Sequence, residues 1–253
     1  MVHRNNSIFR KAFLIFLILS PGWTTVFAFE IQTDSTKTLV KKTADFTVTG
    51  HGDAHQWNTA DWITITKQES STHKNLSTQF KLLYSDKGLY FLFKCEDQKL
   101  SATLTEDFTA LFKEDVIEVF LWPDETVPVY LEYELSPLNY ELVILIPNIN
   151  GRTSGWRPWH YEGKRRTQHA TSVQGGKKES HAAIQSWMGE FFIPYSLLGS
   201  LIMGPPKPGS KWRANFYRID YDDGYNTWTW QKTTPNKAGN FHEYKKFGTI
   251  VFE

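Results

Sequence analysis

Short strand-like segments separated by turn residues run along most of this chain. They cover residues 46–50, 80–84, 89–95, 115–121, 129–135, 140–146, 186–193, 212–219 and 247–252. Ser85-Asp86-Lys87-Gly88 is a hairpin turn between two of them. No segment after the N-terminus keeps the 3.6-residue apolar period of an amphipathic helix. We therefore predict an all-β fold, specifically an antiparallel β-sandwich of the jelly-roll-like kind.

Residues 147–180 break this pattern. They contain five glycines, the basic run Lys164-Arg165-Arg166 and the aromatic residues Trp156, Trp159 and Tyr161. Long loops in compact domains are usually functional or mobile. We predict a long loop insertion here, with short strands at most.

The N-terminus has the features of a secretory signal peptide. Basic residues at positions 4, 10 and 11 precede an apolar run at 12–19, and Val26-Phe27-Ala28 suits a cleavage site. We predict a signal peptide at residues 1–28, one sandwich domain at 29–253, and an exported protein, periplasmic or extracellular. The alternative is an uncleaved anchor helix, although the apolar run is short and Pro21-Gly22 interrupts it.

Charge and cysteine content exclude several classes of protein. The 253 residues carry 28 Lys and Arg against 27 Asp and Glu, so no overall charge attracts nucleic acid or an anionic membrane. Cys95 is the single cysteine and lies in a strand-like segment, which favours a buried thiol over a nucleophile. We expect no nucleic-acid partner, no membrane span after signal removal, and a monomer.

Acidic residues offer an enzymatic alternative. Glu114 and Glu118, and Glu132 and Glu134, share outward faces of neighbouring predicted strands. A glycoside hydrolase acting on O-glycosyl bonds needs two such carboxyl groups at a defined separation. Any two of these four residues and Glu190 would supply the pair. The simpler interpretation is that the four residues form a solvated strand face.

Metal and cofactor signals are weak. Asp97 and Asp115 lie at strand edges and could be oxygen ligands of a structural calcium ion, although no calcium-loop motif accompanies them. The histidine spacing fits no zinc motif. Met188 and Met203 could serve as axial haem ligands, so a haem-binding sandwich is a further alternative. A separate alternative is an interaction module with a vestigial site. We expect no cofactor other than calcium.

Aromatic residues are the most informative group, with 18 Phe, 11 Tyr and 10 Trp. The C–H faces of a pyranose stack on aromatic rings, and its hydroxyls need polar partners beside those rings. Three segments combine both, namely 155–161, 225–231 and 240–243. Trp62, Trp187 and Trp212 lie in strand patterns and are assigned to the core, while Trp57 could be in either place.

The order of these motifs resembles the family 9 carbohydrate-binding modules and the family-9-like domains of secreted bacterial proteins. The resemblance covers about residues 43–253. Its strongest block is Lys113-Glu114-Asp115-Val116-Ile117-Glu118-Val119-Phe120, and Phe241-His242-Glu243-Tyr244-Lys245-Lys246-Phe247-Gly248 closes it. The resemblance implies a β-sandwich that clamps a terminal sugar between two aromatic rings, and calcium in some members.

Carried over to this sequence, the clamp positions are Phe112 and Phe241, where the binding modules use Trp. The resemblance places Lys113, Glu114, Asn240 and His242 beside them as hydroxyl ligands. Further candidates are Trp156, Trp159, Trp228 and Trp230. The predicted function is therefore non-catalytic binding of a mono- or oligosaccharide, in support of polysaccharide capture or breakdown.

Overall fold

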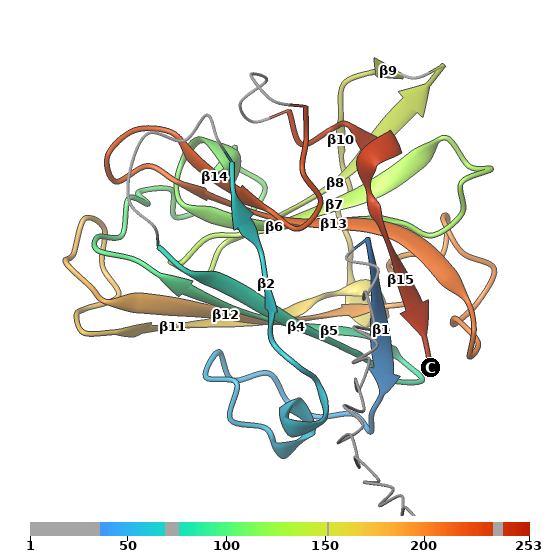
Figure 1. The fold of residues 1–253 in the computed structure, drawn as a ribbon, viewed down its shortest axis with the longest axis horizontal. Helices are drawn as coiled ribbons and strands as arrows, with labels where there is room; N and C mark the ends of the chain where they lie inside the picture. Colours follow the sequence, from blue (N-terminus) through green and yellow to red (C-terminus); the bar gives the residue numbers. More distant parts are fainter. Residues whose placement is uncertain (1–35, 69–75, 151, 235–239) are drawn as a thin grey trace, which may run out of the picture. The chain divides into compact units, whose positions relative to one another are not determined.

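The computed structural model describes residues 36–68, 76–150, 152–234 and 240–253, which form the predicted β-sandwich (Figure 1). The predicted signal peptide lies outside the described residues. Within them, no helix is long and apolar enough to cross a bilayer. Short 3-10 turns are present at η1 (His55–Thr59), η2 (Leu111–Lys113), η3 (Gly163–Arg165) and η4 (Tyr244–Lys246).

The first sheet has the central order β10-β8-β7-β6-β13-β15, with β14 also paired to β13 and β9 to β8. All these pairs are antiparallel. Its strands are β3 (Thr66–Lys67), β6 (Val116–Trp122), β7 (Val129–Leu135), β8 (Glu141–Ile149), β9 (Arg152–Thr153), β10 (Arg157–Pro158), β13 (Lys211–Asp220), β14 (Asn226–Thr229) and β15 (Gly248–Phe252).

The second sheet has the order β4-β5-β12-β11, with β2 paired to β4. Its strands are β2 (Ile63–Thr64), β4 (Thr78–Tyr84), β5 (Gly88–Glu96), β11 (Gln168–Gln174) and β12 (Ser186–Pro194). The strand β1 (Lys37–Lys42) joins the two sheets. Its first four residues pair with β15 and its last two with β4, in both cases in parallel.

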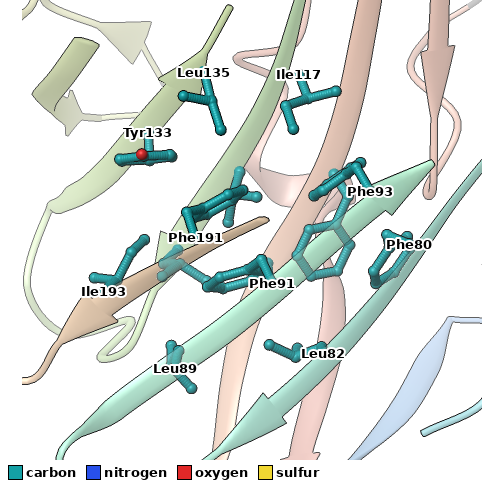
Figure 2. Packing of buried hydrophobic residues seen from close by; sticks show 14 of the residues in the cluster. Phe80, Leu82, Leu89, Phe91, Phe93, Ile117, Tyr133, Leu135, Phe191 and Ile193 are labelled. Carbon is teal, nitrogen blue, oxygen red and sulfur yellow. The ribbon is translucent and has the colours of Figure 1, made fainter. Parts of the chain in front are cut away.

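The main core lies between the two sheets and follows from strand alternation. Ile117 and Leu135 of the first sheet face Phe91, Phe93 and Phe191 of the second (Figure 2). The rings of Phe91 and Phe191 stack with centroids 4.9 Å apart. Aromatic and branched side chains at every second position supply the apolar area that holds the layers together.

Gly189 on β12 shows how closely the sheets approach. A Cβ placed on it would lie 2.6 Å from Cδ1 of Ile117. A side chain at this position would have to displace the end of the Ile117 side chain, so the close packing of the layers favours glycine here.

Both outer faces of the sandwich are also covered. On the first sheet, a second apolar cluster includes Phe120, Tyr130, Ile144, Tyr217 and Phe241. On the second sheet, a third cluster includes Trp57, Leu83, Tyr90, Leu92 and Phe192, and Phe46 and Val48 pack on it. Three apolar layers therefore account for much of the high aromatic content.

Most predicted strands are confirmed, and three of the differences have a clear physical reason. Residues 46–50 are extended chain outside the strands, because their N–H groups donate to side chains: Phe46 N to Tyr90 Oη, and Thr49 and Gly50 N to Glu190. Residues 168–174, predicted as loop, form the edge strand β11, paired along its length with β12. The strand β1 was not predicted, because its Lys-rich sequence lacks apolar alternation on both sides of Val40.

The predicted core residues separate into two groups. Trp187 and Trp212 are buried, and so is Trp57. Trp62 was predicted to be core, and this is wrong: it is 37% exposed, with Lys81 Nζ 5.0 Å from its ring centroid. The prediction for Cys95 is confirmed, since it is fully buried and burial raises the pKa of its thiol to about 12.

Candidate carbohydrate-binding site

The outer face of the first sheet carries a pocket of about 340 Å³. This is within the size range of small-ligand sites. Alternation brings its floor residues together, because Glu118 and Phe120 on β6, Glu132 on β7 and Ile219 on β13 all point to this face. The pocket is rich in aromatic rings, which are Phe112, Phe120, Trp156, Tyr221, Tyr225 and Phe241.

The two predicted clamp residues both line this pocket. Phe112 lies in the 3-10 turn η2, just before β6, and is half-buried. Phe241 follows residues 235–239, which lie outside the described ones, and is 3% exposed. Its ring stacks on Tyr217 at 4.0 Å and 11°, and Tyr217 Oη donates to its carbonyl oxygen at 2.8 Å. Phe241 is therefore held rigidly, while Phe112 presents the more accessible ring.

Three buried carboxyl groups lie beneath these rings. Glu118 pairs with Glu134 across β6 and β7, and Glu132 is the next residue of β7 on the same face. All three are almost fully buried. Burial, and for Glu118 and Glu134 the neighbouring carboxyl groups, raises their pKa values, that of Glu132 to about 8. At neutral pH Glu132 therefore keeps its proton, and the pKa values of Glu118 and Glu134 are shifted in the same direction.

His242 connects the pocket to the neighbouring surface. Its Nδ1 lies 2.8 Å from Tyr130 Oη and 3.9 Å from Glu132 Oε2. Burial lowers the pKa of His242 to about 4, so the imidazole is neutral at physiological pH. A neutral ring held by Tyr130 can offer its other nitrogen to a ligand hydroxyl.

The remaining predicted polar residues lie around the pocket. Asn240 lines a second depression of about 490 Å³ together with His242. Lys113 is exposed beside Phe112. Glu114 turns away, because it accepts hydrogen bonds from the backbone N–H groups of Thr103 and Leu104. Burial raises the pKa of Glu114, but the hydrogen bonds from Thr103 and Leu104 outweigh burial and lower it overall.

A family model described as carbohydrate family 9 binding domain-like matches residues 48–253. The chain belongs to this family. A curated relative, an extracellular protein of Arthroderma benhamiae (strain ATCC MYA-4681 / CBS 112371), is 31% identical over 192 residues, which cover 69% of this chain and 78% of the relative.

Solved structures share the fold of this family 9 domain. One is described as a putative carbohydrate-binding protein from Bacteroides uniformis ATCC 8492, with a TM-score of 0.70, 17% identity and coverage of 86% of this chain and 99% of that one. The others are family 9 modules from Caldicellulosiruptor kristjanssonii. The cellotriose complex has a TM-score of 0.60, 15% identity and coverage of 86% and 93%. The glucose complex has a TM-score of 0.58 and 18% identity, with coverage of 86% of this chain and 95% of that one.

Of the four predicted tryptophans, this family 9 domain places only Trp156 at the pocket, where its ring is 43% exposed. Trp228 is 2% exposed on β14, and its Nε1 donates to the carbonyl of Leu76. Trp159 packs against the core between the sheets and donates to the carbonyl of Leu197. Trp230 packs on Phe216 and beside Gly248. These three rings pack against the core instead of lining the pocket.

Sequence reasoning did not include Tyr221 among the site residues, and it included Tyr225 only as part of the candidate segment 225–231. Both line the pocket, and their rings meet edge to face with centroids 5.5 Å apart. They flank the turn Asp222-Asp223-Gly224. Two tyrosines that flank a turn directly after a strand are the sequence pattern that predicts paired rings at the edge of the sheet.

The hydrolase alternative is not supported by this arrangement. Glu190 lies on the second sheet, where its oxygens accept from Thr49, Gly50 and Trp57, and Glu114 is turned away from the pocket. Glu118 and Glu132 do share the pocket. However, hydrolysis needs one carboxylate that stays ionised, and burial raises the pKa of both. The idea that these faces are solvated is also wrong, since Glu118, Glu132 and Glu134 are buried.

An acidic cluster lies next to the Tyr221 loop. Oxygens of Asp97, Asp115 and Asp222 all lie within 4.8 Å of one another. Asp115 accepts from the N–H groups of Ser101 and Tyr221. Arg218 Nη2 lies 3.1 Å from Asp97. Burial raises the pKa of Asp97 to about 7 and that of Asp115 to about 8. The two aspartates singled out from the sequence are thus joined by a third.

Proposed function

We propose that this family 9 domain binds carbohydrate without catalysis, and that the pocket on the first sheet takes one sugar unit between Phe112 and Phe241. The observation that carries the proposal is the convergence of the two rings on one pocket with a polar floor. A pyranose stacks its C–H faces on such rings and directs its hydroxyls to carboxyl and imidazole groups. Trp156 at the rim would contact the adjoining unit.

The relatives support the ligand class. The Caldicellulosiruptor modules are described in complex with cellotriose and with glucose. For this chain we propose a β-linked oligosaccharide, bound by a monomer. Attachment to polysaccharide would support its capture or breakdown.

Calorimetric titration with a panel of mono- and oligosaccharides tests the proposal. We expect Phe112→Ala to weaken binding about tenfold or more, because it removes one stacking face. The matched control is Trp62→Ala, an exposed ring elsewhere on the domain, which should leave the affinity unchanged. Equal affinities of the Phe112 variant and the parent protein would contradict the clamp.

We also propose that the protein is exported to the cell exterior. The predicted signal peptide supports this, and so does the Arthroderma relative, which is described as extracellular. N-terminal sequencing of the secreted protein should begin near Phe29. Retention of residues 1–28 in the mature protein would contradict it.

For the acidic cluster we propose a structural calcium ion held by Asp97, Asp115 and Asp222. Three convergent carboxyl groups are ligands of the kind that calcium prefers. The ion would fix the loop that carries Tyr221 and Tyr225, and so shape one wall of the pocket.

Thermal unfolding after chelation and after calcium addition tests this site. We expect calcium to raise the Tm by about 5 °C. The variant Asp222→Asn, which changes a half-buried ligand, should abolish the increase in Tm on calcium addition. The control Asp86→Asn, at an exposed position, should keep that increase. A rise that persists in Asp222→Asn would place the ion elsewhere.

A further inference from the structure

The polar part of the pocket has an unusual composition. Its polar lining consists of Glu118, Glu132 and His242, together with the tyrosines, and no lysine, arginine, asparagine or glutamine of the described chain lines it. The tyrosines, the neutral imidazole and the protonated carboxyl groups can donate to and accept from sugar hydroxyls. The two carboxyl groups beneath aromatic rings can in addition pair with a ligand that carries positive charge.

One oxygen of the Glu132 carboxyl group has no hydrogen-bond donor among the described residues. Glu132 is 4% exposed, and its Oε2 accepts no hydrogen bond from the described residues. His242 Nδ1, at 3.9 Å from that oxygen, is beyond hydrogen-bond distance and is already held by Tyr130. Buried carboxyl oxygens without partners are costly unless a ligand satisfies them.

The aromatic rings reinforce the same preference. Phe112, Trp156 and Phe241 line the same pocket as Glu118 and Glu132. Ring faces attract cations, and this attraction strengthens where water is excluded. The hydrogen bond between an ammonium group and a carboxylate is stronger than the one that a neutral hydroxyl would make at the same place.

We propose that the pocket selects an amino sugar, a pyranose unit with a free ammonium group such as a 2-amino-2-deoxyglucose unit, whose ammonium binds Glu132 and Glu118 while its ring stacks on Phe112. This inference rests on the proposed function and names the sugar class. The acetylated form lacks the charge and adds bulk over the carboxyl groups, so the pocket should reject it.

Binding has a consequence for protons. Glu132 lies diagonally across from Glu118, next to Glu134 on the same face of its own strand, and near Tyr130 and His242, so the group is neutral in the free pocket at acidic to neutral pH. An ammonium group stabilises the carboxylate, which then releases its proton to solvent. The neutral sugar needs no such release.

Calorimetry with three trimers that differ only at C2 tests the proposal on the purified full protein. The trimers are β-1,4-linked glucosamine, its N-acetylated form and cellotriose. We expect the glucosamine trimer to bind about tenfold or more tightly than cellotriose. Titrations at about pH 6.5 in two buffers of different ionisation enthalpy should show proton release for the glucosamine trimer alone.

The variant Glu132→Gln keeps the shape and removes the charge, and it should abolish both the preference and the proton release. Equal or tighter binding of cellotriose by the parent protein overturns the amino-sugar inference and leaves the proposed function intact. Absence of binding to all three trimers and to the wider panel overturns both. Because the comparison of ligands uses the parent protein, it stands even if the variant does not fold.

Discussion

At the scale of single residues, Glu190 holds a whole segment of chain. One oxygen accepts from Thr49 N and Gly50 N at 2.8 Å each, and the other accepts from Trp57 Nε1 at 2.7 Å. The variant Glu190→Gln replaces one accepting oxygen with an NH₂ group, which would then face N–H donors. We expect unfolding free energy to fall by about 2–4 kcal/mol, measured by urea denaturation.

The control for this variant is Glu125→Gln, whose side chain is 59% exposed. It should change the unfolding free energy by about 0.5 kcal/mol or less. A similarly small effect of Glu190→Gln would mean that the hydrogen bonds of Glu190 contribute little.

The positions of some pocket residues were predictable from the sequence, whereas their roles stay predictions. The family resemblance put Phe112 and Phe241 at the clamp, and both line the pocket. Alternation gave the correct faces of β6 and β7, yet it could not show that both faces of each sheet are buried. For that reason Glu132 was taken for a solvated side chain and Trp228 for a binding ring.

At the scale of elements, β1 closes the sandwich by pairing with one strand of each sheet. Val40 is fully buried and its neighbour Leu39 is 59% exposed. We expect Val40→Asp to lower the unfolding free energy by about 3–5 kcal/mol, because it buries a carboxyl group in the core.

The adjacent substitution Leu39→Asp is the matched control, since it makes the same chemical change on the opposite face of β1. We expect a change of about 0.5 kcal/mol or less. Chemical denaturation of both variants measures the difference, and equal losses would show that β1 contributes little to the fold.

Elements with strong alternation were predictable, and weakly patterned ones were not. The hairpin of β4 and β5 carries its own signal in the sequence, because its turn and its apolar residues are local. The strands β1 and β11 are polar, so each is recognisable only through its hydrogen-bond partner, which is the far end of the chain for β1 and the following strand β12 for β11. Sequence-local reasoning has no access to those partners.

At the scale of the whole molecule, the buried glutamates make stability depend on pH. Glu132 has a pKa raised from 4.5 to about 8 by burial. Between these values the folded protein keeps a proton that the unfolded chain releases, so unfolding becomes easier as the pH rises. Below about pH 4.5 both states are protonated and this stabilisation is complete.

We therefore expect the unfolding free energy to decline between about pH 4.5 and pH 8, by up to about 1.4 kcal/mol per pH unit for each such group. Glu132→Gln has no proton to lose, so its decline should be shallower and its stability at pH 8 higher than that of the parent protein. Denaturant melts across this range measure both slopes, with Glu125→Gln as the exposed control. Parallel slopes for the parent and Glu132→Gln would mean that Glu132 is ionised in the folded state, which would also remove the basis for proton release on ligand binding.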